Sequence, residues 1–289
     1  MNLHARSQLQ LRTEILTMLD DTSNARWSDT QVYTAINQAL AMWGGRVLVP
    51  HLYQPTDYSW DNNTYEYTLP AWIDERYITP QMEREIPYNG YPLTTDGTET
   101  WVDVPGFTVE PTATGGRKLR FETMPFAVNA RILFWTSPSQ VFTTVPTLNT
   151  SLTSVATSIV LTANATNSYP GFLYLKTEDE FLEGTYSTRA AGTITYSITA
   201  RGLFNTFTDA ATSGTSVYAA VVVPDERLFV QLHDQAMAIL HRMRFGLAAP
   251  EERSVHGQMV QLYQSQADKF WRSWTPNRPI KVRPNRRAL

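Results

Sequence analysis

Apolar residues at helical spacing mark the N-terminal end of the chain. They predict a first helix over about residues 5–19. A second helix is expected to begin at Ser28, because Ser28 and Gln31 have the spacing of a capping box. Gly44 is expected to end it, since glycine tolerates the left-handed conformation that often follows a helix. The apolar positions of the first helix are Leu11, Ile15, Met18 and Leu19.

Two more helices are predicted near the C-terminal end. Pro224 is expected at the first position of one helix and Pro250 at the first position of the other, because proline lacks the backbone N–H that remains unpaired there. Acidic residues follow both prolines, at the positive end of the helix dipole. The expected apolar stripes are Leu228, Leu232, Ile239, Leu240 and Met243 in the first, and Val255, Met259, Leu262, Tyr263, Phe270 and Trp274 in the second.

Between these helical ends, apolar and polar residues alternate with a period of two, which is typical of strands. Proline and glycine separate the runs, and Ser and Thr are abundant. A first β-region is predicted over residues 47–137 and a second over about 140–221. The predicted strands include residues 65–69, 100–104, 118–121, 131–135, 158–161, 171–175, 184–187, 193–198 and 216–221.

The expected fold class is α+β, with an antiparallel β-rich middle. The N-terminal and C-terminal helix pairs cannot bury their apolar faces alone, so we expect them to pack together as a four-helix unit. The second β-region is predicted to be an inserted small β-sandwich or barrel. The expected parts are residues 1–46 and 223–275 for the helical unit, 47–140 for a β-domain, 141–222 for the insertion and 276–289 for an extended arm.

Charge is distributed unevenly along the chain. The formal net charge is −3, but the segment from Pro276 onward has five basic residues, three prolines and no acid. Such an arm is suited to an acidic protein surface or to nucleic acid. We favour docking on a protein, since a pre-extended proline-rich segment loses little entropy on binding. The predicted docking residues are Arg278, Ile280, Lys281, Val282, Arg283, Arg286, Arg287 and Leu289.

Several classes of chemistry are excluded or disfavoured. The chain has no cysteine, which excludes disulfides and thiolate sites. No apolar run approaches the roughly 18 residues that span a bilayer, and the start has no signal-peptide core. We therefore expect a protein that is soluble, does not follow the secretory route and does not bind membranes.

Candidate catalytic and metal sites are weak. His233 and His241 could share a helix face, but no third ligand has matching spacing, so packed or solvated histidines are favoured. Residues 178–180 hold three consecutive carboxylates that could bind a hard cation; a solvated turn or strand edge is favoured instead. Residues 115–118 lack the spacing of a phosphate loop and predict a hairpin turn. We expect no catalytic residue, metal or cofactor, and a protein that is not an enzyme.

Aromatic residues make up 12% of the chain, which leaves a different class of function open. Trp60, Trp72 and Trp101 fall in the first β-region and could stack on sugars. Packing in a core or subunit interface is favoured over sugar binding, because aromatic residues are enriched at interfaces. A carbohydrate- or receptor-binding protein therefore remains an alternative.

Three stretches carry a family resemblance. The first is residues 26–29 (Arg-Trp-Ser-Asp) with 35–39 (Ala-Ile-Asn-Gln-Ala). The second is residues 65–70 with 118–121 and 135–138, and the third is 150–221, which contains the segments 158–161, 183–186 and 200–202. Together they resemble the head-to-tail connector proteins of tailed bacteriophages, also called adaptor or neck proteins. The third stretch resembles a small β-module that recurs in virion proteins.

This resemblance implies a structural protein of the virion, located in the neck between capsid and tail and assembled in the host cytoplasm. It implies a homo-oligomeric ring, commonly of twelve subunits, that is seated beneath the portal protein. DNA would pass through the ring without sequence-specific binding, and tail, nozzle or tail-terminator proteins would attach to the far side. The C-terminal arm would reach into the portal. The alternatives are a carbohydrate- or receptor-binding tail protein and a tail-completion protein.

Overall fold

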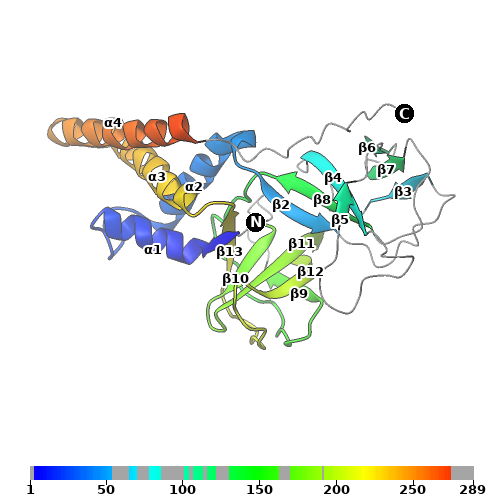
Figure 1. Cartoon of the computed structure of the whole chain (residues 1–289). Helices are drawn as coiled ribbons and strands as arrows, with labels where there is room; N and C mark the ends of the chain where they lie inside the picture. Colours follow the sequence, from blue (N-terminus) through cyan, green and yellow to red (C-terminus); the bar gives the residue numbers. More distant parts are fainter. Residues whose placement is uncertain are drawn as a thin grey trace, which may run out of the picture. The chain divides into compact units, whose positions relative to one another are not determined.

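The computed structural model describes residues 3–53, 65–69, 78–85, 101–103, 107–112, 116–121, 130–162, 170–190 and 192–274. These residues divide into two compact units (Figure 1). One unit combines the residues up to 47 with those from 137 onward, and the other lies within residues 48–136. Both contain antiparallel sheets, and all the helices described belong to the first unit. This mixture agrees with the predicted α+β class.

A six-stranded antiparallel sheet forms the β part of the first unit. The strands lie in the order β1-β13-β10-β11-β12-β9. Most runs predicted in this region form strands. Burial alternates along β9, whereas β10 and nearly all of β13 are buried. The strands are β1 (His4–Ser7), β9 (Ser158–Thr162), β10 (Phe172–Leu175), β11 (Glu180–Ala190), β12 (Thr193–Leu203) and β13 (Val217–Val223).

Backbone hydrogen bonds also link β9, the last strand of this order, to the start of β13, the second strand. The segment 146–149 binds β9 on one side, through Asn149 N–H to Val160 O at 2.8 Å. On its other side it binds the start of β13, through Val217 N–H to Pro146 O at 2.9 Å. The hydrogen bonding therefore continues from β13 through the sheet and back to β13.

The chain begins differently from the sequence prediction. Residues 5–7 were expected in the first helix, but they belong to β1, where His4 pairs with Val223 and Ser7 with Ala220. Ser7 then caps α1 (Gln8–Met18), accepting a hydrogen bond from Gln10 N–H in a capping box. The prediction was wrong here because pairing with a strand more than 200 residues away outweighs local helical periodicity.

The second helix, α2 (Asp29–Trp43), follows its sequence signals closely. Ser28 accepts from the backbone N–H of Gln31, and the Gln31 side chain accepts from the backbone N–H of Ser28. This confirms the predicted capping box. Gly44 ends the helix with φ of 50°, a value that favours glycine. A short 3₁₀ turn, η1 (Gly44–Arg46), follows.

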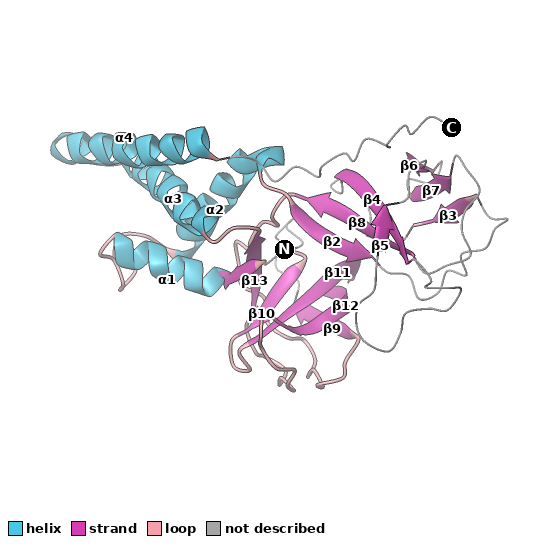
Figure 2. Cartoon of the chain, viewed as in Figure 1, coloured by secondary structure: helices cyan, strands magenta, loops and turns pink. Residues whose placement is uncertain are grey.

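The C-terminal helices are α3 (Arg227–Phe245) and α4 (Pro250–Ser273). Pro250 occupies the first turn of α4, as predicted. The prediction for α3 was wrong by three residues, because β13 continues to Val223 and Asp225 binds the backbone N–H of Arg227 at 2.9 Å. In Figure 2 the helices lie together, and α3 packs against both α2 and α4.

Helices and sheet of the first unit share one hydrophobic core. Trp43 of α2, Phe229 of α3 and Tyr196 of β12 are almost completely buried within the same cluster. Buried polar contacts also join α1 to the sheet: the Gln8 side chain donates to Phe142 O at 2.7 Å and accepts from Ala219 N–H of β13 at 3.1 Å. That residues 141–222 form an insertion stays a prediction. The strands in this range contribute side chains to the same hydrophobic core as the helices.

The second unit contains two smaller antiparallel sheets, with strand orders β2-β8-β4-β5 and β3-β7-β6. In the three-stranded sheet, the rings of Tyr67 and Phe121 make an edge contact with centroids 6.0 Å apart. On this sheet Lys118 lies 3.0 Å from Glu66. The strands are β2 (Val49–Tyr53), β3 (Glu66–Thr68), β4 (Ile78–Glu85), β5 (Trp101–Asp103), β6 (Phe107–Pro111), β7 (Arg117–Phe121) and β8 (Ala130–Thr136).

Candidate functional site

The predicted docking arm lies outside the described residues, so its role stays a prediction. The described chain ends in the last turn of α4, which aromatic side chains hold against the core. Phe270 stacks on Trp274 with ring centroids 5.4 Å apart, and Trp271 makes an edge contact with Trp43 at 6.4 Å. The predicted arm therefore follows, in the sequence, a helix end whose aromatic side chains pack against the core.

The three carboxylates at residues 178–180 separate into different environments. Glu178 and Asp179 lie in a turn between β10 and β11, and Asp179 accepts a hydrogen bond from the Tyr174 hydroxyl at 2.8 Å. Glu180 is fully buried, so the expectation of a solvated side chain was wrong for this residue. It points inward from β11 and binds Arg201 of β12 at 2.7 and 2.5 Å.

The contacts of the Glu180–Arg201 pair indicate that it stabilises the fold and is not a reactive site. Besides the carboxylate, the guanidinium donates to the backbone oxygens of Thr153 and Asp209. Glu180 also accepts from the backbone N–H of Gly202 at 3.3 Å. These bonds use most of the donors and acceptors of both groups, which is what a buried ion pair requires. The pair fastens the loops at residues 153–156 and 205–210 to the sheet.

His233 and His241 occupy separate sites on α3. His233 is buried, and its Nε2 lies 2.9 Å from Glu14 of α1. Glu14 is also 2.6 Å from Arg6. Burial lowers the pKa of His233, while the negative charge of Glu14 opposes this change. This confirms the preferred interpretation of His233 as a packed histidine.

His241 contacts a histidine that the sequence analysis did not single out. Its Nδ1 lies 2.9 Å from Nδ1 of His256 on α4, so one ring donates and the other accepts. His241 also stacks on Tyr263 and contacts the edge of Trp27. Burial, and next the neighbouring His256, lowers the pKa of His241 to about 4. The pair joins α3 to α4, and it requires that one of the two Nδ1 atoms carries no proton.

Other predicted features have simpler outcomes. Gly116 directly precedes β7, and Arg117 and Lys118 already pair with Pro111 and Glu110 of the antiparallel strand β6. Thr112 N–H binds Gly116 O at 2.8 Å, so β6 and β7 form the predicted hairpin, although its turn lies nearer to residues 112–116 than to 115–118. Trp60 and Trp72 lie outside the described residues, and the side chain of Trp101 is not described. Among the residues that are described, no group of three His, Cys, Asp or Glu side chains could hold a metal ion.

The outward faces of α2 and α4 are the feature that the sequence analysis missed. Val255 and Leu262 were predicted to face the core, but their exposed fractions are 53% and 47%. The buried face of α4 instead carries Ala267, with Tyr263 and Phe270 partly buried. The sequence contains a signal that could have identified this surface: between Arg253 and Asp268, α4 has no Asp, Glu, Lys or Arg.

The same absence of charge occurs on α2. Residues 30–45 contain no Asp, Glu, Lys, Arg or His, and Met42 is 57% exposed. Exposed helix faces normally carry many charged residues. Interfaces between proteins, in contrast, are depleted of charge in their centre and enriched in methionine. We call Val255, Met259 and Leu262 the α4 stripe, and Gln38, Ala41 and Met42 the α2 face.

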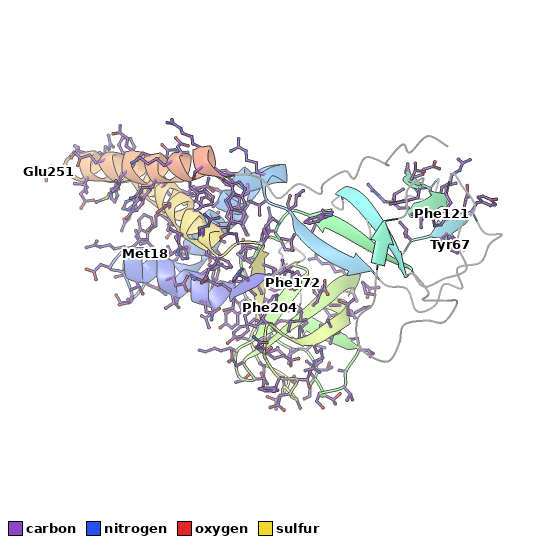
Figure 3. All side chains as sticks on the ribbon, viewed as in Figure 1. Met18, Tyr67, Phe121, Phe172, Phe204 and Glu251 are labelled. Carbon is purple, nitrogen blue, oxygen red and sulfur yellow. The ribbon has the colours of Figure 1, made fainter. Side chains whose placement is uncertain are left out.

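Figure 3 draws the side chains on the helices and labels two residues at helix ends. Glu251 marks the start of α4, and Met18, another exposed methionine, marks the end of α1. α3 packs against both α2 and α4, and Trp271 at the end of α4 also contacts Trp43 at the end of α2. Within the described ranges, no helix is long and apolar enough to cross a membrane.

Comparisons with known proteins do not identify a family. No protein-family model matches the chain. No characterised protein and no solved structure matches it either.

Proposed function

We propose that this chain is a structural protein of a bacteriophage particle, a head-to-tail adaptor that forms a ring beneath the portal. The observation that carries the proposal is the pair of charge-free, partly apolar surfaces on α2 and α4. Two different surfaces on one subunit suit head-to-tail association, which closes into a ring when the rotation from one subunit to the next permits it. The resemblance of residues 26–39 to the start of connector proteins supports the same assignment.

The fold supports this function in two further ways. We infer that the N-terminal and C-terminal helix pairs form one four-helix unit, because α1 packs on α2 and α3, and α4 packs on α3. We also infer that the six-stranded sheet is a small closed barrel, since the segment 146–149 hydrogen-bonds to both β9 and the start of β13. A rigid module of this kind is suited to present the helices in a fixed geometry.

In this proposal the protein is not an enzyme. The buried polar groups of the first unit, Glu180 with Arg201 and His233 with Glu14, serve packing rather than catalysis. The partners are other copies of the chain, the portal protein and components of the tail. DNA passes through the ring without sequence-specific contacts, and the particle neck is the site of action.

The C-terminal arm provides the test. A chain that lacks residues 276–289 should keep its fold and lose binding to rings of the portal protein encoded in the same genome. Co-sedimentation of the full chain and the shortened chain with portal rings measures this difference. A matched variant with Ile280, Val282 and Leu289 changed to serine retains all five positive charges and should also bind more weakly.

Two results would contradict the proposal. Unchanged portal binding by the shortened chain would show that the arm is not the docking segment. Retention of free DNA by the full chain more strongly than portal would favour the nucleic-acid interpretation of the arm instead.

A further inference from the structure

Two histidine rings face each other where α3 packs against α4 (Figure 1). Nδ1 of His241 on α3 lies 2.9 Å from Nδ1 of His256 on α4. The ring centroids are 5.2 Å apart, so each ring directs its Nδ1 atom at the other ring. The contact therefore brings together two nitrogen atoms, from different helices, that can both act as ligands.

Aromatic neighbours hold the His241 ring in this orientation. The ring stacks on Tyr263 of α4 with centroids 5.8 Å apart, and it meets Trp27 edge to face at 6.1 Å. Trp27 directly precedes the residue that caps α2, so the His241 ring contacts side chains from two other parts of the helical region. A ligand whose orientation is already fixed loses little conformational entropy on binding.

His241 is in the form that binds metal ions. Burial, and next the neighbouring His256, lowers the pKa of His241 to about 4, so this ring is neutral at pH 7. A neutral imidazole can carry its single proton on either nitrogen. The proton in the hydrogen bond between the two Nδ1 atoms can therefore move to an Nε2 atom, which leaves both Nδ1 lone pairs free for a metal ion.

The separation of the two nitrogens is close to the one that a metal ion requires. Zn²⁺ holds imidazole nitrogens at about 2.0–2.1 Å, and its tetrahedral geometry places two such ligands roughly 3.3 Å apart. The two Nδ1 atoms of the pair, at 2.9 Å, need to separate by only about 0.4 Å, with a slight tilt of each ring. Both rings are partly exposed, so water can supply the remaining ligands.

We propose that His241 and His256 form an open binding site for a divalent ion of the zinc class, which links α3 to α4. Imidazole ligands favour Zn²⁺, Cu²⁺ and Ni²⁺, whereas Mg²⁺ and Ca²⁺ prefer oxygen ligands. Among the described residues, no third His, Asp or Glu side chain completes the site. Because the chain supplies two ligands, the ion binds reversibly and more weakly than at a structural zinc site, which has four.

The bound ion stabilises the helical region of the first unit. It binds only when α3 and α4 are packed together, because the unfolded chain does not hold the two histidines at this distance. His256 lies near the start of α4, whereas the aromatic contacts of Phe270 and Trp271 lie near its end. The ion therefore fastens the first turns of α4 to α3. This inference does not depend on the adaptor function, since a single subunit contains the whole site.

Isothermal titration calorimetry with Zn²⁺ at pH 7 tests the site. The unchanged chain should bind Zn²⁺ with saturable heat, and its melting temperature should rise with the Zn²⁺ concentration. Mg²⁺ should give no saturable heat. His256→Gln should lower the affinity for Zn²⁺ at least about tenfold, because one imidazole remains. The matched control is His4→Gln, which removes a partly exposed histidine from β1 and should leave the affinity unchanged.

Nitrogen NMR of the histidine side chains gives a second readout on the unchanged chain, so the test does not depend on how well His256→Gln folds. Zn²⁺ should shift the Nδ1 signals of His241 and His256 and leave those of His4 in place. Equal Zn²⁺ affinity in His256→Gln and the unchanged chain would overturn the site. Nδ1 signals that stay unchanged at saturating Zn²⁺ would show that the two histidines form a packing contact only. Both results would leave the adaptor function intact.

Discussion

Glu180 and Arg201 form a doubly hydrogen-bonded ion pair between neighbouring strands of the six-stranded sheet. The carboxylate is fully buried, and only 8% of the Arg201 side chain is exposed. Since the guanidinium also holds the backbone of Thr153 and Asp209, one side chain connects two loops to the sheet. The pair therefore holds both loops against the sheet.

Glu180→Gln should destabilise the first unit strongly. The change leaves the buried guanidinium without a counter-charge, which typically costs about 3–5 kcal/mol. Chemical denaturation followed by circular dichroism measures the loss. Arg12→Gln is the control, because it removes a more exposed ion pair with Asp29 and should cost only about 0–1 kcal/mol. Similar costs for the two variants would contradict a structural role for the buried pair.

Trp43 should contribute more to stability than Trp274. Trp43 is fully buried, and its indole N–H donates to the Gln231 side chain, whereas Trp274 is partly exposed. Trp43→Ala should cost about 3–5 kcal/mol, as expected for a large aromatic residue removed from a core. Trp274→Ala should cost less. Denaturant midpoints of the two variants check this order, and the reverse order would show that the ends of the helices are packed differently.

Acid should weaken the association of α3 with α4 through His241. The pKa of His241 in the folded chain is about 4, below its usual value of 6.5, because of burial and the adjacent His256. The unfolded chain therefore binds the proton first, and stability falls as the pH decreases from about 6.5 to about 4. We expect a loss on the order of 1–2 kcal/mol, since His241 is only half-buried and solvent screens part of the effect.

Asp234, on the same helix, changes the stability of the fold with pH in the opposite direction. Burial raises its pKa from 3.8 to about 6, so the folded chain binds this proton first and gains stability as the pH falls through about 6. Urea unfolding between pH 7 and pH 4 should therefore show a steeper acid loss in Asp234→Asn and a shallower one in His241→Gln. Identical slopes in His241→Gln and the unchanged chain would exclude His241 as the source.

The sequence predicted the start of a helix correctly where a capping residue or a proline beside it sets that start. Ser28 with Gln31 and Pro250 specify their helix starts through contacts within a few residues, and the structure confirms both. The pairing of residues 4–7 with β13 depends on a partner about 215 residues away, so helical periodicity alone gave the wrong start for α1. The predicted strand runs form strands, but β1, β2, β4 and β6 were not predicted, and no local pattern shows which strands are neighbours.

The orientation of α4 could not be predicted for a related reason. Its apolar residues lie on two faces, one through Tyr263 and Phe270 and one through Val255 and Leu262. Periodicity combines both into one stripe, although among the described residues only the first face packs against the rest of the chain. The absence of charge between Arg253 and Asp268 is unusual for a solvated helix face, and it is the sequence signal for the interface that we propose. The predicted arm over residues 276–289 depends on composition alone and remains untested.

The most direct test of the central claim is negative-stain electron microscopy of the full chain mixed with portal rings. The account predicts closed rings of this protein stacked coaxially on one end of the portal, with a continuous central channel. A monomeric protein that leaves the portal undecorated would contradict the adaptor function.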